Sequence, residues 1–212
     1  MKNNKIGLSG WLVAAVLAVM MVASGFQTTG AKFGVVDMAR VLSDSQTGKA
    51  AKDELQNELN LRQGVLEFID TQKVLTREQA DKIRTLSVKP NATAADKAEL
   101  DRVKEQVKAD AKKFNDLMLK PNISDAERTQ LTDFNQRKQQ MEQLLPQWHQ
   151  AFTNELADME ERKMSELGRK AREVIQNLGK KEGYSVVFPT SVALYGANDV
   201  TDAAIKALDA AK

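Results

Sequence analysis

Few residues in this chain have the types and spacing that catalysis or metal binding requires. His149 is the only histidine and there is no cysteine, so a metal site or an acid–base pair would have to combine one imidazole with carboxylates alone. His149 lies among Gln147, Trp148 and Gln150. This setting favours a histidine on a helix surface, or one partly buried with its hydrogen bonds satisfied. We therefore predict that the protein is not an enzyme and holds no cofactor and no metal.

A second candidate site is Thr47-Gly48-Lys49, which follows a β-rich stretch and opens a helical one. Phosphate-binding loops place backbone N–H groups and a lysine around a phosphate in such a position. The motif would also need Gly at position 43 and Ser or Thr at position 50, where this chain has Ser43 and Ala50. We interpret Gly48 as part of a helix start.

Two glycosylation sequons, at Asn91 and Asn122, coincide with a repeated helix-start pattern. Thr76, Thr93 and Ser124 each have Gln, Asp or Glu three residues later, which is the spacing of a capping box. The last two units each follow Lys-Pro-Asn, and proline ends a preceding helix. Capping explains these residues better than glycosylation of a eukaryotic secreted protein, which is the alternative.

Long amphipathic helices account for most of the chain. Apolar residues recur at spacings of three or four through residues 43–74 and, after Pro146, through residues 147–178. Their matched lengths predict an antiparallel pair, roughly 48 Å long at the helical rise per residue. The capping boxes and prolines predict several short helices in the apex, residues 75–146, rather than a continuous coiled coil. Residues 43–182 would form this helical hairpin arm.

Short β-rich segments stand on both sides of the arm, and the hairpin brings them together, so the first must pair with the later ones. A final Ala-rich helix would run to about Ala211, capped by Asp199 or Thr201. The predicted fold class is α+β, with a small β body that carries a long antiparallel helical hairpin. The β-rich segments are residues 32–37, 184–188 and 192–195, and the body comprises residues 32–42 and 183–212.

The N-terminus has the pattern of an export signal. Two lysines precede an uncharged apolar run, residues 6–22, and Ala-Ser-Gly ends at Gly25, where the small residues suit signal peptidase. We predict a signal peptide over residues 1–25, cleavage between Gly25 and Phe26, and a periplasmic or otherwise exported location. The alternative is an anchor in the inner membrane formed by residues 6–22, because about 17 residues is the lower limit for spanning a bilayer.

Without residues 1–25 the chain is neutral. The whole sequence has 31 Lys and Arg against 29 Asp and Glu, and the excess is Lys2 and Lys5, since residues 1–25 contain no acid. Nucleic-acid binding needs a basic surface that releases counterions from phosphates. We therefore exclude nucleic acid as a partner.

Two parts of the chain resemble the Skp/OmpH periplasmic chaperones, over roughly residues 32–75 and 150–212, while the middle is similar only in its helical character. No matching segment is a catalytic signature. The matching segments are Lys32-Phe-Gly-Val-Val-Asp-Met-Ala-Arg-Val-Leu, Thr47-Gly-Lys-Ala-Ala, Gly183-Tyr-Ser-Val-Val-Phe, Ala193-Leu-Tyr and Asp199-Val-Thr-Asp.

The resemblance implies a homotrimer whose strands join in a central β body, with three arms around a cavity. It implies an ATP-independent holding chaperone for unfolded outer-membrane or other envelope proteins. The alternative is a membrane-anchored coiled-coil spacer or scaffold of the cell envelope. This chain departs from the best-known members, which are strongly basic, and its apex is longer and more interrupted than a simple arm. Carried onto this chain, the trimer body would include Val35, Val36, Val186, Val187, Leu194 and Tyr195.

Overall fold

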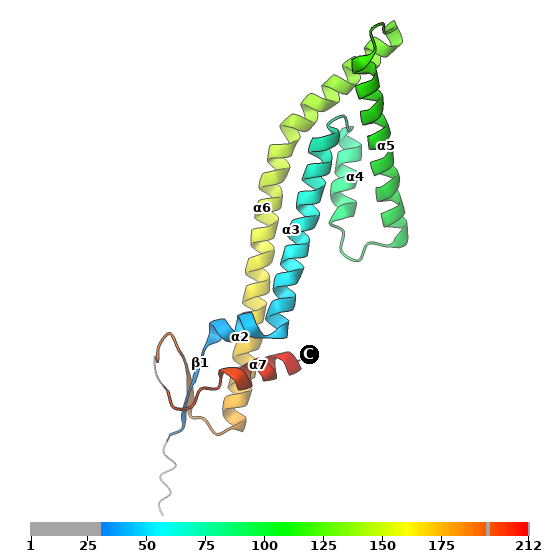
Figure 1. Cartoon of the computed structure of the whole chain (residues 1–212). Coiled ribbons are helices and arrows are strands. Elements are labelled where there is room, and N and C mark those ends of the chain that lie inside the picture. The colour runs from blue at the N-terminus through cyan, green and yellow to red at the C-terminus, as the bar shows by residue number, and fades with distance from the viewer. Residues whose placement is uncertain (1–30, 194–195, 212) are drawn as a thin grey trace, which may run out of the picture.

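A long helical arm rises from a small body that contains both ends of the described chain (Figure 1). The computed structural model describes residues 31–193 and 196–211. The predicted cleavage site at Gly25 and Phe26 lies outside these residues, as do Leu194 and Tyr195. In chain order the elements are β1 (Phe33–Val36), α2 (Met38–Asp44), α3 (Gln46–Gln72), α4 (Arg77–Ser87), α5 (Ala94–Leu119), α6 (Asp125–Lys181), β2 (Val186–Pro189) and α7 (Thr201–Ala210).

The shaft of the arm is the pair α3 and α6, which run in opposite directions side by side (Figure 1). Lys163 of α6 forms an ion pair with Glu54 of α3 at 2.6 Å. About two turns further from the body, Glu155 of α6 lies 3.4 Å from Arg62 of α3. The sum of the paired residue numbers stays constant along the pair, as it must for antiparallel helices.

Helix α6 continues through Pro146, so the prediction that the second arm helix begins after this proline is wrong. The helix begins at Asp125 and contains Pro146 in its interior. An internal proline costs about 3 kcal/mol or more. Met141 and Leu144 on one side of it and Trp148 on the other are all buried, and full burial of each such side chain contributes roughly 1.5–3 kcal/mol. Packing on both sides therefore keeps the helix continuous.

The apex is a bundle rather than a chain of short helices. The predicted breaks are present before α5 and α6, but α5 has 26 residues against 11 in α4, so only one of the pieces is short. Helix α4 folds back toward the body along α3, and α5 runs outward again beside it to the tip of the arm (Figure 1). The buried side chains between the four helices are Val65, Ile69, Leu75, Ala80, Ile83, Val103, Val107, Met141, Leu144, Trp148 and Phe152.

In the body, β1 pairs in parallel with β2, with Phe33 opposite Val186 and Val35 opposite Phe188. This confirms that the first strand pairs with a later segment. The other edge of β1 bonds the C-terminal segment, where Val35 bridges Asp199. The third β-rich segment is not a strand at its start, because Val192 lies in a turn and its N–H donates to the Pro189 carbonyl at 2.9 Å.

Three helices cover one face of this sheet: α2, α7 and the end of α6. Helix α7 ends at Ala210, and its N-cap is Val200 without a side-chain cap hydrogen bond, so the predicted cap at Asp199 or Thr201 is wrong. The Asp199 carboxylate accepts the Thr201 N–H at 2.8 Å instead. The Thr201 hydroxyl accepts the N–H of Asp37 at 2.9 Å, which ties the C-terminal helix to the start of α2. The buried side chains of this second core are Val36, Val41, Leu167, Ala171, Ile175, Val200, Ala204 and Leu208.

The corner between α2 and α3 depends on Gly48. Ser45 caps α3 by accepting the Gly48 N–H at 3.0 Å, which confirms the interpretation of this segment as a helix start. A Cβ atom on Gly48 would lie 1.6 Å from the backbone oxygen of Leu42, so only glycine lets the two helices approach this closely. The corner sets the direction in which the arm leaves the body.

Candidate functional site

The outer face of the sheet is apolar and open to solvent. Side chains alternate across a strand, and Val36 and Val187 point into the body core. On the opposite face Phe33, Val186 and Phe188 remain 52%, 42% and 37% exposed. The rings of Phe33 and Phe188 lie 6.2 Å apart, so they form one patch across the two strands.

Of the four predicted trimer-body residues that the structure describes, Val35, Val36, Val186 and Val187, only Val186 lies in this patch. Val35 shares the face but is 7% exposed, because the C-terminal segment covers it: its N–H donates to the Asn198 carbonyl and its carbonyl accepts from Val200, both at 2.9 Å. Sequence reasoning missed Phe33 and Phe188. The alternation of side chains along each strand would have placed them opposite the core.

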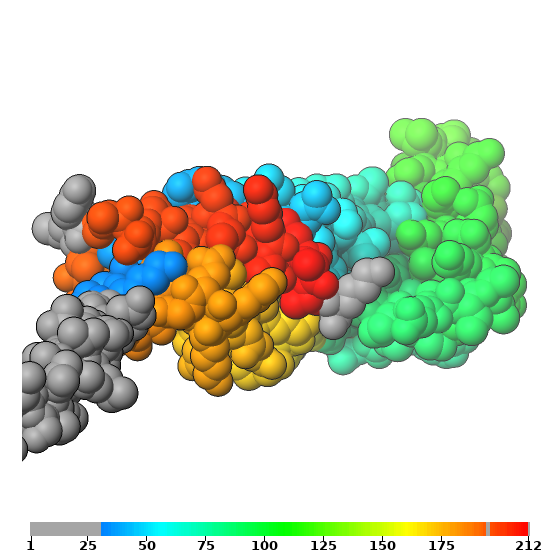
Figure 2. Space-filling view, turned by 90° about the horizontal axis from the view of Figure 1, so that it is seen from below, coloured from blue at the N-terminus to red at the C-terminus, as the bar shows by residue number. Residues whose placement is uncertain are grey.

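Strand β2 is also an edge. The sheet contains β1 and β2, and in the described part of the chain β2 has no strand partner on its other side. Figure 2 views the molecule from the body end and shows β1, in blue, at the surface between the C-terminal segment and the end of α6. An open edge beside an apolar patch is a surface suited to association with another chain.

A charged network ties the bundle to the shaft. The side chain of Arg62 is 7% exposed and contacts the carboxylate of Glu58 and, at 3.4 Å, that of Glu155. Arg84 of α4 bonds the same Glu155 at 2.8 Å and lies 5.2 Å from the ring of Trp148. This network joins α3, α4 and α6, and it pairs the buried guanidinium of Arg62 with carboxylates.

The two carboxyls with the lowest pKa values belong to helix caps. The ammonium of Lys89, 2.7 Å away, and the backbone N–H of Thr93 lower the pKa of Asp96 to about 2. Lys120, also at 2.7 Å, acts in the same way on Glu127, whose pKa falls to about 2. A strongly perturbed pKa often marks a catalytic group. Here the causes are a neighbouring lysine and, after it, the hydrogen bonds of the capping box. The three predicted capping boxes are all present.

No metal-binding arrangement is found among the described residues. His149 lies exposed on α6, and residues 31–193 and 196–211 contain no group of three or more His, Asp or Glu side chains placed to hold a metal ion. In the same part of the chain, no helix is both long and apolar enough to cross a bilayer.

One comparison with known proteins gives a match, and it covers most of the chain. Residues 32–208 match the family described as outer membrane protein (OmpH-like). The match spans both strands, the arm and nearly all of α7. No curated protein and no solved structure matches. The OmpH-like family is a chaperone family, and its members are known as periplasmic chaperones of outer-membrane proteins. The chain therefore belongs to the OmpH-like family.

Proposed function

We propose that this protein is a homotrimeric holding chaperone that binds unfolded outer-membrane or other envelope proteins after export, without ATP. Family membership supports the chaperone class and the type of client. The observation that supports the proposed trimer is the exposed patch of Phe33, Val186 and Phe188 beside an open strand edge. A two-stranded sheet is marginal alone, and joining three copies would cover the patches and the edges together.

The trimer is tested with Val186→Asp. Val186 packs outside the chain's own core, so the substitution leaves the single chain intact, whereas burying an unpaired carboxylate between chains costs several kcal/mol. Val187→Asp is a poorer probe, because Val187 packs against the body core. Leu119→Asp, at the far tip of the arm where Leu119 is 84% exposed, is the matched control. Light scattering should find the control trimeric and Val186→Asp monomeric, and a trimer of Val186→Asp would contradict this assembly.

Client contacts are proposed for the shaft, between the body and the bundle. Leu59 and Leu61 of α3 and Met164 of α6 are 42%, 46% and 38% exposed there. Such side chains offer several weak apolar contacts to an unfolded chain. Because the chain without residues 1–25 is neutral, holding would depend on apolar contact and enclosure more than on charge, and added salt should weaken it little.

The chaperone activity is tested by diluting an unfolded β-barrel protein into buffer with the purified protein and following aggregation by turbidity. We expect suppression near one trimer per client, with or without ATP. Replacing Leu59, Leu61 and Met164 together by serine should reduce it. A full-length protein that stays a folded trimer and leaves aggregation unchanged would refute the chaperone function.

We also propose that residues 1–25 are a cleaved signal, that the protein is periplasmic, and that residues 32–42 and 183–212 form the body while residues 43–182 form the arm. Intact-mass measurement of the exported protein tests the cleavage, with Phe26 expected as the first residue. A chain that keeps residues 6–22 and has no effect on aggregation would instead support an anchored spacer or scaffold.

A further inference from the structure

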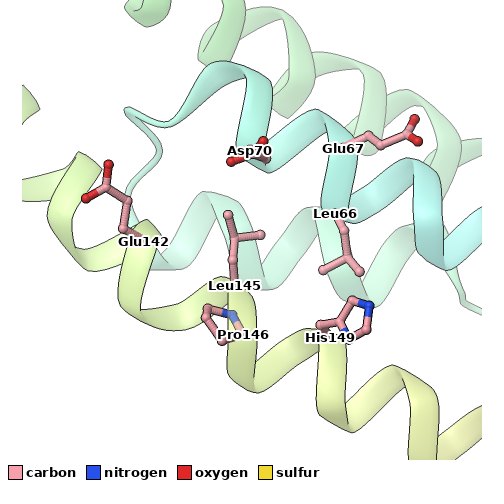
Figure 3. A pocket seen from close by; sticks show the side chains of 7 residues that line it. All are labelled: Leu66, Glu67, Asp70, Glu142, Leu145, Pro146 and His149. Atoms are coloured by element: carbon pink, nitrogen blue, oxygen red, sulfur yellow. The ribbon is translucent and has the colours of Figure 1, made fainter.

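A groove of about 520 Å³ runs between the outer part of α3 and the middle of α6. Its volume falls within the range of about 300–1,000 Å³ that is usual for ligand sites. Leu66 of α3 points toward His149 of α6, and Leu145 points toward α3 beside Pro146 (Figure 3). Leu66 and Leu145 pack on the bundle core, so the floor of the groove is apolar and fixed.

Hydrogen-bond acceptors line the rim of this groove. Its charged side chains are the carboxylates of Glu67, Asp70 and Glu142. Asp70 and Glu142 have partly exposed lysines nearby, Lys73 at the end of α3 and Lys138 of α6, at 3.4 and 4.0 Å. Exposed pairs of this kind contribute little and exchange with solvent. Among the described residues Glu67 has no ion pair, and its carboxylate accepts a hydrogen bond from the side-chain amide of Gln63, one turn earlier, at 2.9 Å.

Pro146 adds a further acceptor to this wall. Because proline has no N–H, the backbone carbonyl of Glu142, four residues earlier, lacks its usual helical donor. The groove thus combines an apolar floor, three carboxylates and a backbone carbonyl that lacks its helical hydrogen-bond donor. An anion would be repelled, and an uncharged apolar segment would leave the carboxylate of Glu67 without a cation. A group with an aliphatic stem and a cationic, donor-rich end satisfies both parts.

We propose that this groove binds a lysine or arginine side chain, together with its apolar neighbours, in an unfolded client segment. The inference rests on the proposed chaperone function and names the part of a client that one site recognises. The aliphatic stem lies on Leu66, Leu145 and Pro146, and the cation lies among the three carboxylates. Strands of outer-membrane barrels alternate apolar and polar residues, so an unfolded barrel protein offers such side chains with apolar residues nearby.

The test uses the full trimeric protein and two short capped peptides, one alternating leucine and arginine and the other alternating leucine and glutamine. Fluorescence anisotropy gives the affinity of each at low and high salt. The groove variant combines Glu67→Gln, Asp70→Asn and Glu142→Gln. The control combines Asp53→Asn, Asp101→Asn and Glu160→Gln, which changes net charge equally at exposed positions of α3, α5 and α6 that do not line the groove.

The arginine peptide should bind the unmodified protein more tightly than the glutamine peptide, and high salt should remove most of the difference. The groove variant should bind the arginine peptide roughly threefold or more weakly, because each of three exposed charge pairs contributes a factor of about 1.4 to 5. The control should bind within a factor of about two. Equal losses in both triple variants would show a general charge effect and overturn the proposal.

His149 gives an independent measurement of where the peptide binds. It is the only histidine of the chain, so in protein without an affinity tag a single imidazole reports the groove wall in NMR spectra. Its resonances should shift when the arginine peptide is added and stay in place in the groove variant. If the protein suppresses client aggregation while the peptides bind equally and His149 does not respond, this inference fails and the chaperone function stands. If aggregation is unaffected, the chaperone function itself fails.

Discussion

Gly48 and Gly64 allow the same one-methyl change at two positions of α3 with opposite expected results. At Gly64 an added Cβ meets nothing within 4 Å, so Gly64→Ala gains only helix propensity, about 0.5–1 kcal/mol of stability. At Gly48 the same atom would lie 1.6 Å from the oxygen and 2.8 Å from the carbonyl carbon of Leu42. Both are backbone atoms, which cannot rotate away as a side chain does.

Gly48→Ala therefore has to separate the end of α2 from the first turn of α3. Overpacking typically costs 1–3 kcal/mol, and this contact lies at the upper end because the backbone must move. After subtracting the propensity gain, we expect a loss of roughly 2 kcal/mol, so the two variants should differ by about 3 kcal/mol. That difference is a large part of the 5–15 kcal/mol that stabilises a typical domain.

Urea unfolding at one fixed protein concentration measures this difference, since the stability of the proposed trimer would depend on concentration. The midpoint should rise for Gly64→Ala and fall for Gly48→Ala, with unchanged slopes. X-ray scattering should also detect a changed angle between body and arm in Gly48→Ala if it remains folded. If Gly48→Ala proves as stable as Gly64→Ala, the close approach of α2 and α3 at this corner is wrong.

Three further predictions concern the arm. Glu155→Ala removes the carboxylate shared by Arg62 and Arg84 and should destabilise by about 1–2 kcal/mol, with Glu160→Ala, which changes an exposed acid, as the control near zero. The folded-state pKa values of Asp96 and Glu127 are lowered to about 2. The stability that these carboxylates give the folded protein is therefore present above pH of about 4 and is lost as the pH falls toward 2. Acid unfolding of the double variant Asp96→Asn with Glu127→Gln should show a shallower pH dependence than that of the unmodified protein. Amides of residues 87–93 and 118–124 should exchange faster than those of residues 55–70, because the helices break there, and uniform protection through both loops would contradict the breaks.

Local signals in the sequence were sufficient for the starts of α4, α5 and α6. Thr76, Thr93 and Ser124 cap helices as predicted, because a capping box needs only residues three apart in the chain. The pairing of the first strand with a later one was also predictable, because the hairpin leaves it no other partner.

Structure that depends on distant packing was not predictable in this way. Pro146 looked like a helix start because a local rule weighs the lost hydrogen bond but not the buried side chains on both sides of it. The length of α5 was missed because its buried residues, such as Val103 and Val107, face helices that are close only in the folded chain. For the same reason the acidic groove has no sequence motif: Glu67 and Glu142 are far apart in the chain and meet only through the register of α3 and α6.

The bundle changes what the arm can do independently of the body. Residues of α4 and α5 bury Val65 and Ile69 of α3 and Trp148 and Phe152 of α6, so this part of the arm has a core within one chain and does not need a second chain to cover it. Replacing residues 75–146 by a short turn would expose that core and would test folding rather than client binding. Surface substitutions in the shaft and the groove separate an effect on client binding from an effect on folding. The side chains that they alter lie at the surface, while the bundle core beneath them is unchanged.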